Sequence, residues 1–124
     1  MKSFSNEAYY LFFSTLASRT RLAIIDVLSE GSKTLSEVSQ ALDQQKSVIL
    51  KNLERLEHCA LVRSQGLGGE ERYSLNMEIV EPLSEIIEFH TSKYCPDLKT
   101  CIPPGMLKQF MTKEAGKETF IEHQ

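Results

Sequence analysis

The sequence predicts a mainly α-helical fold that carries one small β-hairpin, an α+β arrangement. Apolar residues recur at helical spacing over residues 4–60 and again over residues 77–93, whereas residues 61–75 alternate as strands do. A glycine-rich segment interrupts the alternating stretch, which is typical of a hairpin tip. The 124 residues are enough for one domain and a tail, which we place at residues 1–93 and 94–124.

Two helices are expected at the start of the chain. The first, over about residues 4–17, carries an unusual number of aromatic side chains. This favours a buried partner surface, for which a dimer interface is one candidate. The second helix covers about residues 19–30 and ends at Gly31, because glycine accepts the backbone conformation that closes a helix.

A short helix and a longer one follow, joined by a tight turn. Thr34 and Glu37 match a capping box, in which each side chain accepts a hydrogen bond from the other residue's backbone. The short helix therefore begins there, and residues 43–45 form the turn. The longer helix runs over about residues 46–59, and its apolar residues at i, i+4 and i+7 are expected to face the core: Ile49, Leu53 and Leu56.

The two strands of the hairpin are predicted at residues 61–65 and 71–75. A last long helix, over about residues 77–93, is expected to bury one face, formed by Ile79, Val80, Leu83, Ile86, Ile87 and His90. Prolines interrupt the chain after this helix. The tail is expected to hold one further short helix, whose apolar residues are Met106, Leu107, Phe110 and Met111.

The composition excludes several classes of protein. No apolar run approaches the roughly 20 residues of a membrane span, and the first residues lack a secretory signal, so we expect a cytoplasmic protein without a membrane partner. Three cysteines cannot all pair within one chain, which is unlike a secreted disulfide-rich domain. We find neither a phosphate-binding glycine loop before a helix nor a nucleophile–base constellation, so we expect no enzyme.

Two helices joined by a tight turn and followed by a hairpin form a winged helix-turn-helix, whose second helix enters the major groove of double-stranded DNA. The side chains expected to contact DNA are Gln45, Lys46, Ser47, Val48, Lys51, Asn52, Arg55 and Arg72. Gln and Asn pair with adenine, Lys with guanine or phosphate, and Val with a thymine methyl, whereas Arg55 suits phosphate. The net charge of −3 argues mildly against DNA, but residues 44–63 are locally basic.

Three stretches in this order resemble the ArsR family of winged-helix repressors. Residues 16–25 (LASRTRLAII) resemble the family's LADPTRLRIL opening, residues 41–56 its turn and recognition helix, and residues 61–75 its wing. The resemblance covers about half of the chain. It implies a homodimer formed by the first and last long helices, with two recognition helices on successive major grooves. It also implies an operator-binding repressor, often released by a metal ion or an oxidant.

The chain departs from this family at several positions. Members often carry a Cys-x-Cys-type metal site in the helix before the recognition helix, but here residues 35–39 read LSEVS. Three single residues also differ: Leu50 replaces a usual serine, Asn52 a usual histidine and Ala60 an expected glycine. The hairpin tip is acidic, which leaves Arg72 as the one clear wing contact to phosphate.

A candidate sensor lies at the end of the last helix and in the tail, where His90, Cys95 and Cys101 are close in sequence. Thiolate and imidazole are ligands that a transition metal ion such as zinc prefers, so a metal site is one hypothesis. A second hypothesis is redox sensing, in which Cys95 and Cys101 close a disulfide. In the third, His90 is an ordinary inward residue and both cysteines pack as small apolar side chains. No cofactor is certain.

The sequence therefore predicts a DNA-binding transcriptional regulator, a repressor that acts as a homodimer on a partly palindromic operator. The alternative is a winged-helix protein-interaction module with little or no DNA binding. The acidic charge balance, the acidic hairpin tip and the apolar segment 106–111 favour that alternative.

Overall fold

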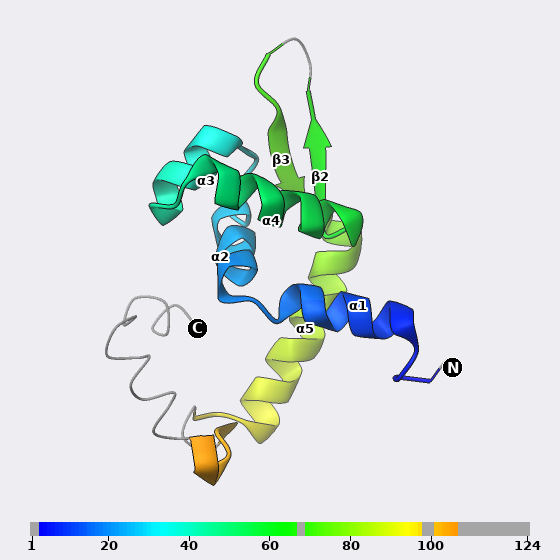
Figure 1. The fold of residues 1–124 in the computed structure, drawn as a ribbon. Helices are drawn as coiled ribbons and strands as arrows, with labels where there is room; N and C mark the ends of the chain where they lie inside the picture. Colours follow the sequence, from blue (N-terminus) through cyan, green and yellow to red (C-terminus); the bar gives the residue numbers. More distant parts are fainter. Residues whose placement is uncertain (1–2, 67–68, 98–100, 107–124) are drawn as a thin grey trace. The chain divides into compact units, whose positions relative to one another are not determined.

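The computed structural model describes residues 3–66, 69–97 and 101–106, and the chain divides into two compact units, Met1–Val80 and Glu81–Gln124. The first unit combines four helices with three strands (Figure 1). In chain order these are α1 (Glu7–Leu16), α2 (Arg19–Leu28), β1 (Lys33–Thr34), α3 (Leu35–Leu42), α4 (Lys46–His58), β2 (Val62–Gln65) and β3 (Arg72–Leu75). The helix α5 (Met77–Tyr94) begins in the first unit and continues into the second, which also holds the short 3-10 helix η1 (Pro104–Met106). The predicted fold class is confirmed.

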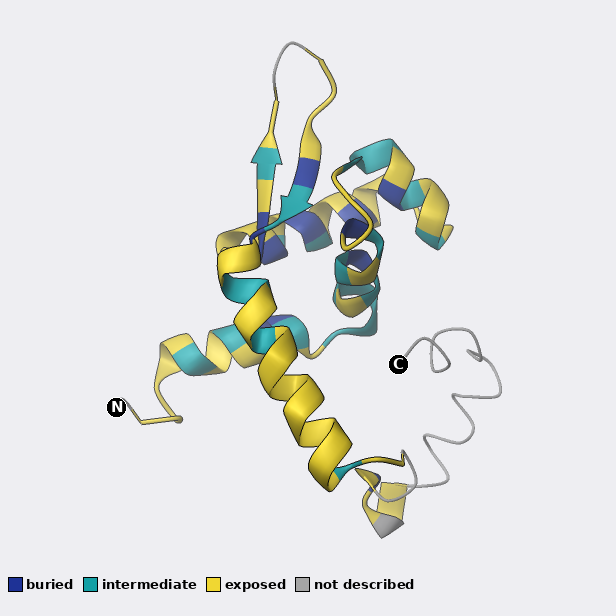
Figure 2. Ribbon diagram, turned by 180° about the vertical axis from the view of Figure 1, so that it is seen from behind, coloured by how far each residue is buried: buried dark blue, intermediate teal, exposed yellow. Residues whose placement is uncertain are grey.

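The core of the first unit lies among α2, α3, α4 and the strands (Figure 2). As the sequence predicts, Ile49, Leu53 and Leu56 of α4 are fully buried. The other buried apolar residues of this unit are Ile24, Leu28, Val38, Leu61, Val62 and Tyr73. Burying a large aliphatic side chain contributes about 1.5–3 kcal/mol, so one face of α4 is firmly anchored and its opposite face is presented to solvent.

The turn between α3 and α4 forms where the sequence predicts it. The backbone N–H of Glu37 donates to the Thr34 hydroxyl at 3.2 Å, and the N–H of Thr34 donates to the Glu37 carboxylate at 2.9 Å. The second of these bonds is the main reason why the pKa of Glu37 lies below its usual range. After α3, Asp43 adopts the left-handed conformation with φ of 52°, which aspartate tolerates. The two helices therefore form a helix-turn-helix.

The wing is a three-stranded antiparallel sheet in the order β1-β3-β2. The hairpin of β2 and β3 is confirmed, with Val62 opposite Leu75 and Ser64 opposite Tyr73. The sequence does not predict β1, because two residues are too few to show alternation. Tyr73 is only 4% exposed, and its burial, followed by its 3.1 Å hydrogen bond to Glu71, raises its pKa to about 12.

The backbone at Ala60, between α4 and the wing, adopts a conformation that suits the glycine expected at this position. Its φ is 61°, in the left-handed region that costs a residue with a Cβ about 1 kcal/mol. The buried Asn76 holds this turn, since its side-chain N–H donates to the Ala60 carbonyl at 2.8 Å. Gly31, the predicted stop after α2, has φ of 139°, which side chains rarely allow.

The predicted burial of one face of α5 is not found in the single chain. No residue of α5 is buried (Figure 2). Ile86 and Ile87 are 66% and 50% exposed. His90 is also exposed, while three of the expected residues are half-buried: Ile79, Val80 and Leu83. Periodicity reveals an apolar stripe but not what covers it.

The further short helix expected in the tail lies mostly outside the described residues, since 107–124 are not among them. None of the helices in residues 3–66, 69–97 and 101–106 is long and apolar enough to cross a membrane.

Candidate DNA-binding surface

The first half of α4 presents an exposed polar surface. Five of the predicted contact residues are exposed: Gln45, Lys46, Ser47, Val48 and Lys51. Gln45 immediately precedes the helix and makes no side-chain cap hydrogen bond, and Val48 is 38% exposed. Within the described residues, neither Lys46 nor Lys51 takes part in an ion pair. Amide, hydroxyl, methyl and ammonium groups are therefore all exposed at the N-terminal end of α4.

Asn52 and Arg55 are oriented differently from the other predicted contacts. Both are half-buried. The side-chain oxygen of Asn52 accepts a hydrogen bond from Arg21 at 2.9 Å, and its amide N–H donates to the Val48 carbonyl, also at 2.9 Å. Arg55 donates to the Thr15 hydroxyl at 3.0 Å. These two side chains are directed toward α1 and α2, and their contact with DNA stays a prediction.

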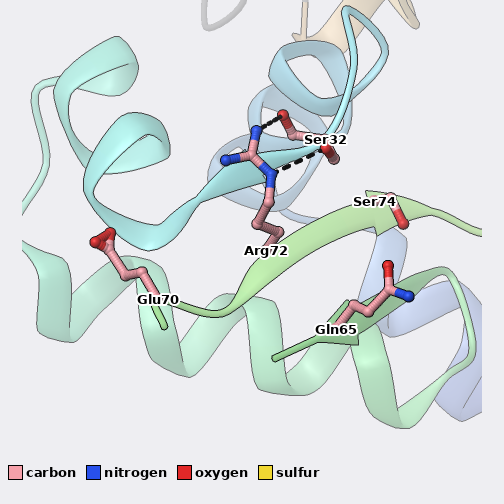
Figure 3. Close-up of a pocket in the computed structure, with 5 residues that line it drawn as sticks. All are labelled: Ser32, Gln65, Glu70, Arg72 and Ser74. Carbon is pink, nitrogen blue, oxygen red and sulfur yellow. Dashed lines mark hydrogen bonds between the residues drawn. The ribbon is translucent and has the colours of Figure 1, made fainter. Parts of the chain in front are cut away.

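Arg72, the predicted wing contact, is bonded to the segment before β1. Its Nε donates to the Ser32 hydroxyl at 3.2 Å and its Nη2 to the Ser32 carbonyl at 2.9 Å, as the dashed lines in Figure 3 show. Its guanidinium also pairs with Glu37 at 3.7 Å. The pocket around it is lined by Ser32, Gln65, Glu70, Arg72 and Ser74. The ion pair is exposed to solvent and adds little to the two hydrogen bonds that hold Arg72 to Ser32.

Two exposed residues of α4 belong to this surface but are not among the predicted contacts. Leu50 is 36% exposed, and Glu54 is also exposed. Glu54 follows Ser47 and Lys51 at spacings of seven and three residues, so all three lie on one helical stripe. The same spacing is present in the sequence and could have placed Glu54 on this stripe. The carboxylate of Glu54 places a negative charge in the C-terminal half of α4, and this charge repels phosphate there.

In the second unit, Cys95 and Cys101 are joined by a disulfide, with their Cα atoms 5.1 Å apart. His90 lies against Tyr94, with ring centres 5.7 Å apart. Among the residues that the structure describes, no three His, Cys, Asp or Glu side chains are grouped to hold a metal ion. The structure thus brings the two cysteines together, and a metal site with His90 stays a prediction that needs both thiols free. Cys59 is a free cysteine that contacts Thr15 at 3.3 Å.

The helix-turn-helix of α3 and α4, followed by the hairpin of β2 and β3, defines a winged helix-turn-helix protein. Residues 18–64 match the family model described as bacterial regulatory protein, arsR family. Over these residues the resemblance to the ArsR family that was seen in the sequence is confirmed. This family and this fold are those of DNA-binding transcriptional regulators, which are not enzymes. No curated protein sequence matches the chain at a significant level.

Solved structures share this fold. The homodimeric winged helix-turn-helix DNA-binding domain of Mb0332 from Mycobacterium bovis is 22% identical with a TM-score of 0.63, and the match covers 71% of this chain and 82% of that one. Rv0081 of M. tuberculosis is 25% identical with a TM-score of 0.61, covering 71% and 93%. The reduced form of the transcriptional regulator YodB from B. subtilis is 21% identical with a TM-score of 0.59, covering 73% and 94%.

Proposed function

We propose that this protein is a transcriptional repressor that binds a partly palindromic operator in double-stranded DNA as a homodimer. The observation that carries the proposal is the exposed polar first half of α4, anchored on its other face by Ile49 and Leu53. A major groove about 12 Å wide accepts one such helix. Gln45 and Val48 are then positioned to meet base edges, and Lys51 to meet phosphate.

A second copy of the chain is the partner that best suits the exposed apolar faces of α1 and α5. Tyr10 and Phe13 of α1 are both more than half exposed, as are Ile86 and Phe89 of α5. Exposed apolar surface of this extent is uncommon on monomers and marks association sites. The similar M. bovis domain is homodimeric. A two-fold dimer presents two α4 helices and therefore matches an operator with two related half-sites.

Release from the operator is proposed to follow oxidation of the tail. Closing the bond between Cys95 and Cys101 transfers two electrons to an oxidant and releases two protons, and it ties the tail to the end of α5. A signal changes DNA affinity only if it binds or stabilises one dimer geometry over another. Because α5 is one of the two proposed dimer helices, a change at its end can alter the spacing of the two α4 helices. Zinc binding by the reduced cysteines and His90 is the competing mechanism.

The proposal is tested by fluorescence anisotropy with labelled duplexes that tile the region upstream of the protein's own gene. Reduced protein is expected to bind at least one fragment in a salt-sensitive manner, and diamide is expected to weaken that binding. Cys95→Ser should bind equally with and without diamide. If the competing zinc mechanism operates, added zinc weakens DNA binding by the reduced protein, whereas diamide does not. Absence of binding to every fragment, reduced or oxidised, contradicts the proposal.

The second candidate function is a protein-interaction module. The charge distribution favours it, since the net charge is −3 and two of the wing's cations are already paired: Arg63 with Glu78 and Arg72 with Glu37, both at 3.7 Å. Leu50 also adds apolar surface to the exposed side of α4. Co-purification of one stable protein partner, with no DNA enriched, supports this candidate over the repressor.

A further inference from the structure

The helix α1 contacts the rest of its unit through a buried polar residue. Only one residue of α1 is buried, and it is a threonine, Thr15, which is 0% exposed. Its hydroxyl donates to the Leu11 carbonyl at 2.8 Å, accepts from Arg55 of α4 at 3.0 Å and lies 3.3 Å from the thiol of Cys59. The buried part of α1 is therefore tied to the recognition helix by directional hydrogen bonds. Such bonds fix a geometry more narrowly than apolar contacts do.

Arg21 of α2 makes a second connection between α1 and α4. Its Nε donates to the Thr15 carbonyl at 2.6 Å and its Nη2 to the Ser14 carbonyl at 3.4 Å. On its other side, Nη1 donates to the side-chain oxygen of Asn52 at 2.9 Å. One planar guanidinium thus joins the last turn of α1 to the middle of α4.

Both ends of the Asn52 amide are used inside the protein. The oxygen accepts from Arg21, and the nitrogen donates to the Val48 carbonyl one turn earlier. A bidentate contact with adenine requires the same oxygen and nitrogen. The oxygen keeps a second lone pair and the nitrogen a second hydrogen, but the two internal bonds hold the amide toward Arg21 and the α4 backbone. Turning the amide to face a base would break them and leave Nη1 of the partly buried Arg21 without its acceptor, which is costly.

The two arginines of this network have no anionic partner among the described residues. Arg21 and Arg55 are not in any ion pair there, and their acceptors are neutral oxygens. Partial burial, and then the positive charge of Arg55, lower the pKa of Arg21. Because two like charges are held together only by neutral acceptors, the arrangement depends on each acceptor being in place.

We infer that Arg21 and Asn52 are a positioning pair, which sets the orientation of the recognition helix relative to α1, and that Asn52 does not read a base. This inference rests on the proposed DNA-binding function and deepens it. It replaces the sequence-based hypothesis that Asn52 pairs with adenine. It also gives α1, a proposed dimer helix, a direct connection to the half of α4 that contacts DNA.

The test is selection from a pool of randomised DNA duplexes by the purified full chain and its variants, followed by sequencing and titration of the best duplex. Asn52→Ala and Arg21→Lys are each expected to weaken binding about tenfold, the order of one hydrogen bond to a charged group. The base preferences should remain those of the unmodified chain. The double variant is expected to lose less than the sum of the two single losses, because both single changes remove the bond between Arg21 and Asn52. Gln40→Ala, which truncates an exposed side chain of α3, is the matched control and should bind normally.

Base readout by Asn52 gives a different result. Loss of preference at one base pair in each half-site, with the other positions unchanged, overturns the inference. So do additive losses in the double variant. If Arg21→Lys does not fold, Asn52→Asp replaces it, because a carboxylate still accepts from Arg21 but cannot donate to adenine N7 and so cannot form the bidentate pair. Retained base preferences in Asn52→Asp support the inference, and their loss at one base pair overturns it. Failure of the unmodified chain to enrich any sequence refutes the proposed function itself, and the inference with it.

Discussion

Lys51 provides the most quantitative test of the proposed DNA contact. It is exposed on α4 and, like Lys46, takes part in no ion pair within the described residues. Two such lysines per protomer amount to about four phosphate contacts per dimer, which predict a slope of about −3.6 for log K against log salt. Lys51→Ala removes two of the four and should reduce the slope to about −1.8. A fourfold rise in salt then weakens the unmodified protein about 150-fold and the variant about 12-fold.

The measurement is a series of anisotropy titrations with the best selected duplex at increasing potassium chloride. Lys33→Ala is the control, because it removes the same charge from β1, where the lysine is paired with Glu30 at 3.9 Å. It should leave the slope unchanged. An unchanged slope in Lys51→Ala, or an equal change in Lys33→Ala, refutes the assignment of Lys51 to phosphate.

Three further predictions concern stability and assembly. Thr34→Ala removes a helix cap and should lower the unfolding free energy by about 1 kcal/mol in urea, whereas Ser36→Ala in the first turn of α3 should not; equal losses contradict the capping role. The pKa of Tyr73 is raised from 10.0 to about 12. The contribution of the neutral Tyr73 to the free energy of unfolding is therefore fully present below pH 10 and is lost as the pH rises through 12. Stability should therefore fall by about 2–3 kcal/mol over that range, and Tyr73→Phe, but not Tyr10→Phe, should reduce this loss; identical alkaline profiles contradict it. Ile86→Glu places a charge on the exposed apolar face of α5 and should convert a dimer to a monomer in light scattering while the helical circular dichroism is kept, and a persistent dimer argues against that interface.

Local patterns in the sequence were sufficient for most of the fold. Thr34 and Glu37 stand three residues apart, and the structure has the capping box that this spacing predicts. The spacing of Ile49, Leu53 and Leu56 likewise predicts the buried face of α4. Features of this kind depend on residues within one or two turns, so the sequence alone determines them.

The parts that could not be predicted depend on distant residues. Helical spacing places Asn52 near the outward side of α4, but its partner Arg21 is 31 residues away and Arg55 finds Thr15 at a separation of 40. Nothing in the local sequence shows which side chain will be met there. The strand β1 could not be predicted for a related reason, since its pairing with β3 joins Thr34 and Arg72, which are 38 residues apart in the sequence. The burial of α5 cannot be predicted from one chain if a second chain covers it.

The proposed role of α4 is tested most directly by finding where the protein contacts DNA. Fragments of genomic DNA are selected with the purified reduced protein, and the enriched sites are then examined by methylation interference at guanine N7, which lies in the major groove. We expect an inverted repeat whose half-site centres lie about one helical turn, or a multiple of it, apart, with interference in both halves. Enrichment of no sequence over random fragments, or a site with interference in only one half, contradicts a symmetric pair of recognition helices.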